Sequence, residues 1–125
     1  MLRDQARRAG LAVQPLRADL EAARWLPLAP ARCAALLVFR YLHRPLAPAL
    51  EEALRPGGLL LYETFTVFQR EYGYGPVNPA FLLEPGELPR LFPRLEVLSF
   101  WEGVAEGARP AAVARLAARR PAAER

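Results

Sequence analysis

The polar residues of this chain that could do chemistry follow two apolar runs. Arg40, Tyr41 and His43 come directly after the run Cys33–Phe39, and Glu63 lies near the end of the second run. An imidazole has a pKa near neutral and can serve as a general base, while a carboxylate can face a substrate. The alternative for the histidine is a helix cap or a solvated position, and the alternative for the glutamate is an ion pair with a nearby arginine.

The two apolar runs predict the strands that position these residues. Cys33–Phe39 is apolar without alternation, which is typical of a central parallel strand covered by helices on both faces. A helix is expected over Pro45–Leu54, with Glu51 and Glu52 on its polar side, and Leu59–Phe65 is expected to be the second buried strand. Two parallel strands joined by one helix form a right-handed βαβ unit, so the fold class is α/β.

Three shorter elements are expected before the first run. The apolar spacing over Leu2–Ala9 predicts a helix, which Gly10 ends. Leu11–Arg17 favours a strand, and Pro15 restricts it to a sheet edge or a strand end because proline has no N–H. Asp19–Trp25 can form a helical turn.

The C-terminal part predicts a loop, a helix and two more strands. Thr66–Leu83 is long, aromatic and rich in Gly and Pro, which indicates an ordered functional loop. A short helix is expected over Glu84–Phe92 and a third strand over Leu95–Trp101. Pro110–Ala118 favours a fourth strand after a turn-rich segment, and its alanine content is also compatible with a helix.

Composition limits the chain to one soluble domain. With 125 residues, one core is expected over residues 1–118, followed by a flexible tail over residues 119–125. The sequence has no apolar run of about 20 residues that would span a bilayer. It also has no secretory signal, so a cytoplasmic location is expected. Cys33 is the only cysteine, and without a Cys or His cluster no structural metal is expected.

The basic charge does not predict a nucleic-acid partner. The net charge is +4, and all 17 basic residues are arginines. They are dispersed along the chain, which favours solvated faces over a functional basic stripe, and the composition is typical of a GC-rich genome. A steep loss of binding with salt would be the signature of the alternative, a nucleic-acid binder.

One long segment has a family resemblance. Leu36–Phe65 is LLVFRYLHRPLAPALEEALRPGGLLLYETF, and it resembles the fourth strand, fourth helix and fifth strand of class I S-adenosylmethionine-dependent methyltransferases. The turn LRPGG at Leu54–Gly58 is similar to a recurrent turn of that family. YLHRPL together with ETF is similar to its tellurite-resistance-like, small-molecule members. RADLE at Arg17–Glu21 resembles the loop after the third strand, and LLEPGELPRLFPRLEVLSFWEG resembles the fifth helix and the sixth strand.

The resemblance implies a cofactor site for S-adenosylmethionine and a small-molecule acceptor site. In this family an acidic residue after the third strand accepts a hydrogen bond from the adenine amino group, which implies that role for Asp19; a helix N-cap is its alternative role. His43 is implied near the methyl-transfer point, as a general base. The implied cofactor-binding residues are Asp19, Leu20, Phe39, Arg40 and Tyr41. The implied substrate-facing residues are Glu63, Phe65 and Tyr72.

The aromatic residues of the long loop have two interpretations. In similar methyltransferases this loop covers the substrate, and its rings could bind a planar or cationic group. The alternative is that the rings cover the apolar sheet edge or make a dimer contact.

The chain departs from the family in the part that holds most of the cofactor. The first strand, its G-x-G-x-G loop and the acidic residue ending the second strand have no counterpart, since Gly10 is isolated. The implied fold is a partial Rossmann-like methyltransferase sheet, mostly parallel with an antiparallel C-terminal strand, that lacks the first two strands. The expected function is methyl transfer by a truncated methyltransferase-like protein. The alternatives are a non-catalytic dimeric interaction or regulatory module, or a gene that begins upstream.

The incomplete sheet predicts an exposed strand edge. The family's strand order is 3-2-1-4-5-7-6, so without strands 1 and 2 the strand Cys33–Phe39 has a bare edge that invites pairing. Either Leu11–Arg17 moves beside it or a second copy pairs there. We expect a homodimer through the exposed strand edge, with Cys33–Phe39 or Leu11–Arg17 at or near the interface.

Overall fold

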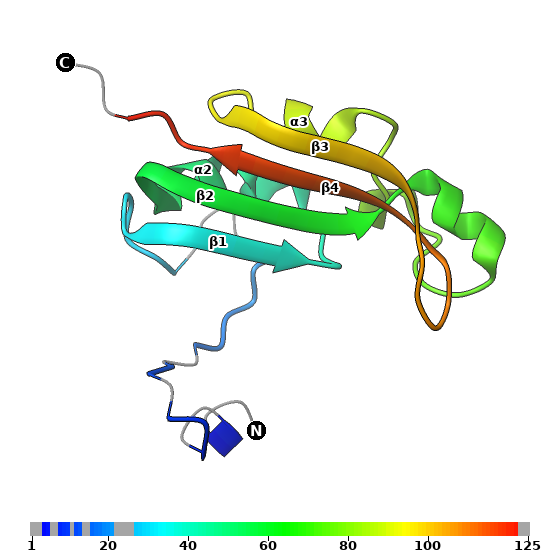
Figure 1. The fold of residues 1–125 in the computed structure, drawn as a ribbon, viewed down its shortest axis with the longest axis horizontal. Helices are drawn as coiled ribbons and strands as arrows, with labels where there is room; N and C mark the ends of the chain where they lie inside the picture. The colour runs from blue at the N-terminus through cyan, green and yellow to red at the C-terminus, as the bar shows by residue number, and fades with distance from the viewer. Residues whose placement is uncertain (1–3, 6–7, 11, 14–15, 22–26, 123–125) are drawn as a thin grey trace.

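A four-stranded mixed sheet organises the part of the chain that the structure describes (Figure 1). The structure is a computed structural model, and it describes residues 4–5, 8–10, 12–13, 16–21 and 27–122. The strand order is β1-β2-β4-β3. The strands are β1 (Cys33–Phe39), β2 (Leu54–Phe65), β3 (Glu96–Ala105) and β4 (Ala111–Arg119). The helical elements are η1 (Arg44–Leu46), α2 (Ala47–Ala53), η2 (Val67–Tyr72), η3 (Pro79–Phe81) and α3 (Glu87–Arg90).

The strand directions confirm the predicted α/β class. β1 pairs with β2 in parallel, and β4 is antiparallel to both β2 and β3. The C-terminal segment is therefore the antiparallel strand that was expected over Pro110–Ala118. In the family numbering of the strands this order corresponds to 4-5-7-6. β1 is an edge strand among the described residues, as expected.

The second strand begins earlier than its apolar run. β2 starts at Leu54, which pairs with Cys33, whereas a helix was expected to continue to Leu54 and the strand to begin at Leu59. Gly58 makes this close pairing possible, because a Cβ there would lie 2.9 Å from the carbonyl oxygen of Cys33 and 2.8 Å from that of Arg55. The glycines of the LRPGG turn thus belong to the strand.

One face of the sheet holds the hydrophobic core. Leu60 and Tyr62 on β2 lie opposite Ala118 and Leu116 on β4. These side chains are buried with Leu42, Leu83, Leu88 and Phe92 from the helices and loops on that side. The Tyr62 hydroxyl donates a hydrogen bond of 2.7 Å to the Tyr41 carbonyl, and burial raises the pKa of this phenol.

The other face, which we call the open face, carries its side chains in three rows across the four strands. From β1 to β3 the rows are Ala35, Leu59, Arg119 and Glu96; Leu37, Leu61, Ala117 and Ser99; and Phe39, Glu63, Arg115 and Trp101. Leu37 is 61% exposed and Phe39 is 56% exposed. The expectation that helices cover Cys33–Phe39 on both faces is therefore wrong for the described residues, because α2 and α3 both lie behind the sheet (Figure 1).

The burial of Glu51 also differs from the prediction. This residue was expected on the polar side of its helix, but the structure buries it to 4% exposure. Its carboxylate accepts hydrogen bonds from the Arg94 backbone N–H at 2.9 Å and from Arg94 Nε at 3.2 Å. These charge-assisted bonds compensate for the desolvation of the buried carboxylate.

The expected N-terminal elements lie partly outside the described residues. Residues 4–5 and 8 are helical, and Gly10 ends this turn with φ of +71°. Residues 12–13 and 16–17 of the expected strand Leu11–Arg17 belong to no strand, and residues 11 and 14–15 lie outside the described part. Residues 22–25 of the expected turn Asp19–Trp25 also lie outside it.

The C-terminal end of the sheet extends further than expected. Arg119, expected in a flexible tail, belongs to β4, and the Arg120 N–H donates to the Gly58 carbonyl at 2.9 Å. Across the described residues, no helix combines the length and apolar character needed to cross a membrane.

Candidate functional site

Arg40 marks the carboxyl end of β1 with an uncommon backbone conformation. Its φ is +57°, in the left-handed region that non-glycine residues rarely adopt. Its N–H donates to the Glu63 carbonyl at 2.7 Å, and its Nε donates to Glu63 Oε2 at 3.0 Å. The guanidinium carbon lies 4.6 Å from the centre of the Phe65 ring. The strained residue thus ties the ends of the two parallel strands together, and such strain is common at functional sites.

Glu63 is held between two arginines. Besides Arg40, it accepts a hydrogen bond of 2.6 Å from Arg115 Nε, and Arg115 lies 5.0 Å from the centre of the Trp101 ring. Partial burial acts to raise the pKa of the Glu63 carboxyl, but the hydrogen bonds and charges of the two arginines outweigh it and lower the pKa below its usual value. Of the two roles predicted for Glu63, the structure therefore shows the ion pair with nearby arginines.

A shallow hollow of about 460 Å³ lies on the open face beside this ion pair. Its lining includes Phe39, Leu61, Glu63, Trp101 and Ala117, so it crosses from β1 to β3. Ala117 lines it together with larger apolar side chains.

Tyr41 and Asp19, two of the predicted cofactor-binding residues, lie near each other. The Tyr41 hydroxyl is buried and has no hydrogen-bond partner in the part of the chain that the structure describes. Burial raises the pKa of this phenol, and the nearby charges of Glu21 and Asp19 raise it further. The turn that contains these carboxylates therefore lies close to the end of β1. Asp19 Oδ1 also accepts a 3.1 Å hydrogen bond from the Glu21 N–H, which is local capping of that turn.

The remaining predicted residues are placed less specifically. His43 precedes η1 and its side chain makes no capping hydrogen bond there, while its carbonyl accepts from the Leu46 N–H at 3.0 Å. Leu20 is half-buried in the turn after Asp19. Phe39 lies on the open face in the same row as Glu63, separate from the core side.

Tyr72 belongs to a different hollow from Glu63. A cavity of about 360 Å³ is lined by Thr66, Phe68, Glu71, Tyr72 and Glu102, together with parts of β3 and β4. It combines two aromatic rings with two carboxylates. The predicted substrate-facing residues are therefore divided: Glu63 and Phe65 contact Arg40, and Tyr72 lines this second hollow.

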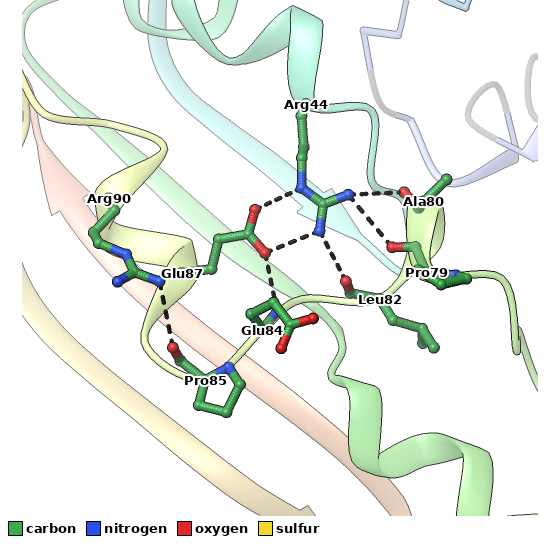
Figure 2. A network of polar contacts seen from close by, with 8 residues as sticks. All are labelled: Arg44, Pro79, Ala80, Leu82, Glu84, Pro85, Glu87 and Arg90. Atoms are coloured by element: carbon green, nitrogen blue, oxygen red, sulfur yellow. Dashed lines mark hydrogen bonds and ion pairs between the residues drawn. The ribbon is translucent and has the colours of Figure 1, made fainter.

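Arg44 is an important residue that sequence reasoning missed. Figure 2 shows its guanidinium reaching the Glu87 carboxylate and the carbonyls of the η3 segment. Its Nη2 donates to Glu87 Oε1 at 2.9 Å and to the Leu82 carbonyl at 2.8 Å. The hydrogen bond from Arg44 lowers the pKa of Glu87, against the opposing effect of partial burial. The partners are 38 and 43 residues away in sequence, so no local pattern indicates the contact.

Metal binding finds no support in the described side chains. Among residues 4–5, 8–10, 12–13, 16–21 and 27–122, no group of three or more His, Cys, Asp or Glu side chains could hold a metal ion.

Solved structures with the same fold include proteins described as methyltransferases, the protein TehB and a cyclase. TehB from Haemophilus influenzae has a TM-score of 0.72 at 15% identity, covering 95% of this chain and 45% of that chain. The geranyl diphosphate C-methyltransferase of Streptomyces coelicolor A3(2), solved with S-adenosyl-L-homocysteine, has a TM-score of 0.64 at 14% identity, covering 94% and 59%. The [4+2]-cyclase SpnF has a TM-score of 0.71 at 16% identity, covering 97% and 61%. No protein-family model and no curated protein sequence matches the chain.

These similarities define the fold as that of class I methyltransferases. The four described strands form part of the Rossmann-like sheet of that fold. The chain spans 45 to 61% of the length of these three solved proteins. Because one of them is named a cyclase, the fold by itself does not select methyl transfer.

Proposed function

We propose that this chain binds S-adenosylmethionine at the carboxyl end of β1 and takes part in methyl transfer to a small molecule. The observation that carries the proposal is the buried Tyr41 hydroxyl, which has no hydrogen-bond partner among the described residues and lies beside the turn that contains Asp19. In open α/β sheets, ligands bind at the carboxyl ends of the strands, and Tyr41 follows that end of β1.

The side chains at this place fit the adenine end of the cofactor. Adenine has an amino group that donates hydrogen bonds and ring nitrogens that accept them. The Asp19 carboxylate can accept from the amino group, and the Tyr41 hydroxyl can donate to a ring nitrogen. When bound, S-adenosylmethionine supplies an electrophilic methyl group on its sulfonium. The contribution of this chain is to position and orient the ligand.

The hollow beside Tyr72 is the proposed acceptor site. Its two aromatic rings provide faces for a planar or cationic group, and Glu71 and Glu102 add negative charge. An acceptor with an amine or a planar ring suits this lining. His43, two residues after Tyr41, is the proposed general base for the acceptor.

Hydrogen exchange with and without S-adenosylmethionine tests the cofactor site. With cofactor at about 1 mM, we expect slower amide exchange in peptides that cover Asp19–Glu21 and Phe39–His43. Peptides that cover α3 should be unchanged. Asp19→Ala should remove most of the protection, and Glu106→Ala should retain it, because Glu106 is an exposed residue between β3 and β4. Protection that is absent, or that survives Asp19→Ala in full, contradicts the proposal.

A second candidate function rests on a different observation. The open face exposes a contiguous set of apolar side chains, which favours a protein interaction module. Such a module needs no cofactor, and the two functions are separated by whether S-adenosylmethionine binds.

A further inference from the structure

The hollow on the open face has an apolar lining that is exposed to solvent. Phe39, Leu61 and Trp101 line it and are 56, 39 and 43% exposed. Ala117 and Ser99, which are paired across β4 and β3, contribute small side chains to the lining. The volume of about 460 Å³ is within the range of small-molecule sites, about 300 to 1,000 Å³. A flat apolar group that covers this lining removes exposed apolar surface from water, which stabilises the bound state.

The polar side of the hollow carries an excess of positive charge. Glu63 and Arg115 belong to the lining, and Arg40 contacts the other carboxylate oxygen of Glu63. Two guanidiniums share one carboxylate, so the cluster has more positive than negative charge. The side chains of Arg115 and Arg40 are 52 and 43% exposed, whereas that of Glu63 is 15% exposed. The positive charge therefore faces solvent beside the apolar lining.

The two arginines are held in place and still have donors available. Both donate to Glu63 through Nε, Arg115 at 2.6 Å and Arg40 at 3.0 Å. These bonds leave the Nη groups of both guanidiniums for a further acceptor. Arg115 also lies 5.0 Å from the centre of the Trp101 ring, which fixes the guanidinium next to the apolar lining. A guanidinium placed in this way suits a carboxylate, because its planar N–H groups form paired hydrogen bonds with the two oxygens.

We propose that this hollow binds a small aromatic anion. The flat ring system lies on the apolar lining between Phe39 and Trp101, and the carboxylate accepts hydrogen bonds from Arg115, with Arg40 adding positive charge. The charge favours this class of ligand over a purely apolar partner, which would cover the cluster and leave its excess charge without a counter-ion. The cavity beside Tyr72 includes two carboxylates in its lining and disfavours such an anion. The two hollows therefore select ligands of opposite charge.

A pair of probes with the same ring system tests the role of the charge. 2-Naphthoate carries a carboxylate, and 2-naphthamide carries a neutral amide in its place. In a Trp25→Phe variant, Trp101 is the only tryptophan left, so its indole N–H resonance reports binding at the hollow. Adding 2-naphthoate up to about 1 mM should move this resonance along a saturation curve, and 2-naphthamide should bind about fivefold more weakly or less. No shift with 2-naphthoate, or equal affinities for the two probes, overturns the proposal.

Substitutions in the same background separate the two parts of the site. Arg115→Gln should lower the affinity for 2-naphthoate about fivefold and leave that for 2-naphthamide nearly unchanged, because it removes the charge and little of the apolar lining. The matched control is Arg70→Gln, since Arg70 is also exposed but lies on η2, outside the open face. It should bind both probes like the parent protein.

Ala117→Leu tests the apolar part and keeps every charge. The larger side chain fills the hollow, so this variant should bind both probes more weakly. Affinity for 2-naphthoate that survives both Arg115→Gln and Ala117→Leu shows that the probe binds elsewhere and overturns the proposal. The far-UV circular dichroism of each variant checks that the sheet is retained. No readout involves S-adenosylmethionine, so the result is independent of the proposed function.

Discussion

Arg44 joins three segments that are far apart in sequence. Its guanidinium contacts the Glu87 carboxylate on α3 and the carbonyls of Pro79, Ala80 and Leu82 around η3 (Figure 2). Glu87→Gln should lower the free energy of unfolding by about 2 kcal/mol at neutral pH, because hydrogen bonds to charged groups contribute more than neutral ones. Urea denaturation measures the change, with the exposed Glu106→Gln as the control, which should be nearly neutral.

The same pair predicts a dependence of stability on pH. The Arg44 hydrogen bond, offset in part by burial, lowers the pKa of Glu87 in the folded state below its unfolded value. A lowered folded pKa means that the stabilisation is fully present above the unfolded pKa of about 4.3. It is lost as the pH falls through the folded pKa. The difference in unfolding free energy between wild type and Glu87→Gln should therefore be largest near neutrality. It should fall toward zero as the pH decreases to about 2. A difference that is constant over this range contradicts the assignment.

Arg40 provides a test of backbone strain at the candidate site. Arg40→Ala and Arg40→Gly both remove the ion pair with Glu63, but glycine accepts the φ of +57° without strain. Arg40→Gly should therefore be more stable than Arg40→Ala by about 1 kcal/mol, despite the greater chain entropy of glycine. Thermal unfolding of the two variants measures this. If the alanine variant is the more stable, Arg40 does not hold strain.

At the scale of elements, the loop after β2 is anchored by one buried amide. Gln69 on η2 is fully buried, its Oε1 accepts from the Ala112 N–H at 2.8 Å, and its Nε2 donates to the Tyr74 carbonyl at 3.1 Å. Gln69→Leu leaves the Ala112 N–H without a partner. We expect a loss of about 2 kcal/mol in unfolding free energy, together with faster proteolysis of residues 67–81. Equal proteolysis rates in the two proteins would show that the amide is not the anchor.

The elements differ in how well the sequence predicts them. β1, and β2 from Leu59 onward, follow from short, mostly apolar runs of strand length, although β1 is exposed on the open face. The start of β2 at Leu54 does not follow from the sequence pattern, because it depends on close contact with Cys33 across the sheet. Glu51 has the pattern of a solvated residue, and only tertiary contact with Arg94 explains its burial.

The candidate site also combines features that the sequence predicts with features that it does not. The position of Arg40, Tyr41 and Glu63 at one sheet edge follows from the end points of two parallel strands, and the structure places them there. The ion pair between Glu63 and Arg115 could not be foreseen, because it joins neighbouring strands 52 residues apart. The open face was also unforeseen, since an apolar strand does not indicate which element covers it.

At the scale of the whole molecule, we propose that this part of a methyltransferase-like sheet provides a cofactor site. The most direct measurement is a calorimetric titration of the purified chain with S-adenosylmethionine up to about 1 mM, a range in which about 4 kcal/mol of binding free energy is detectable. We expect saturable binding of one cofactor per chain and a higher melting temperature in its presence. No heat of binding and no change in melting temperature over this range would contradict the claim.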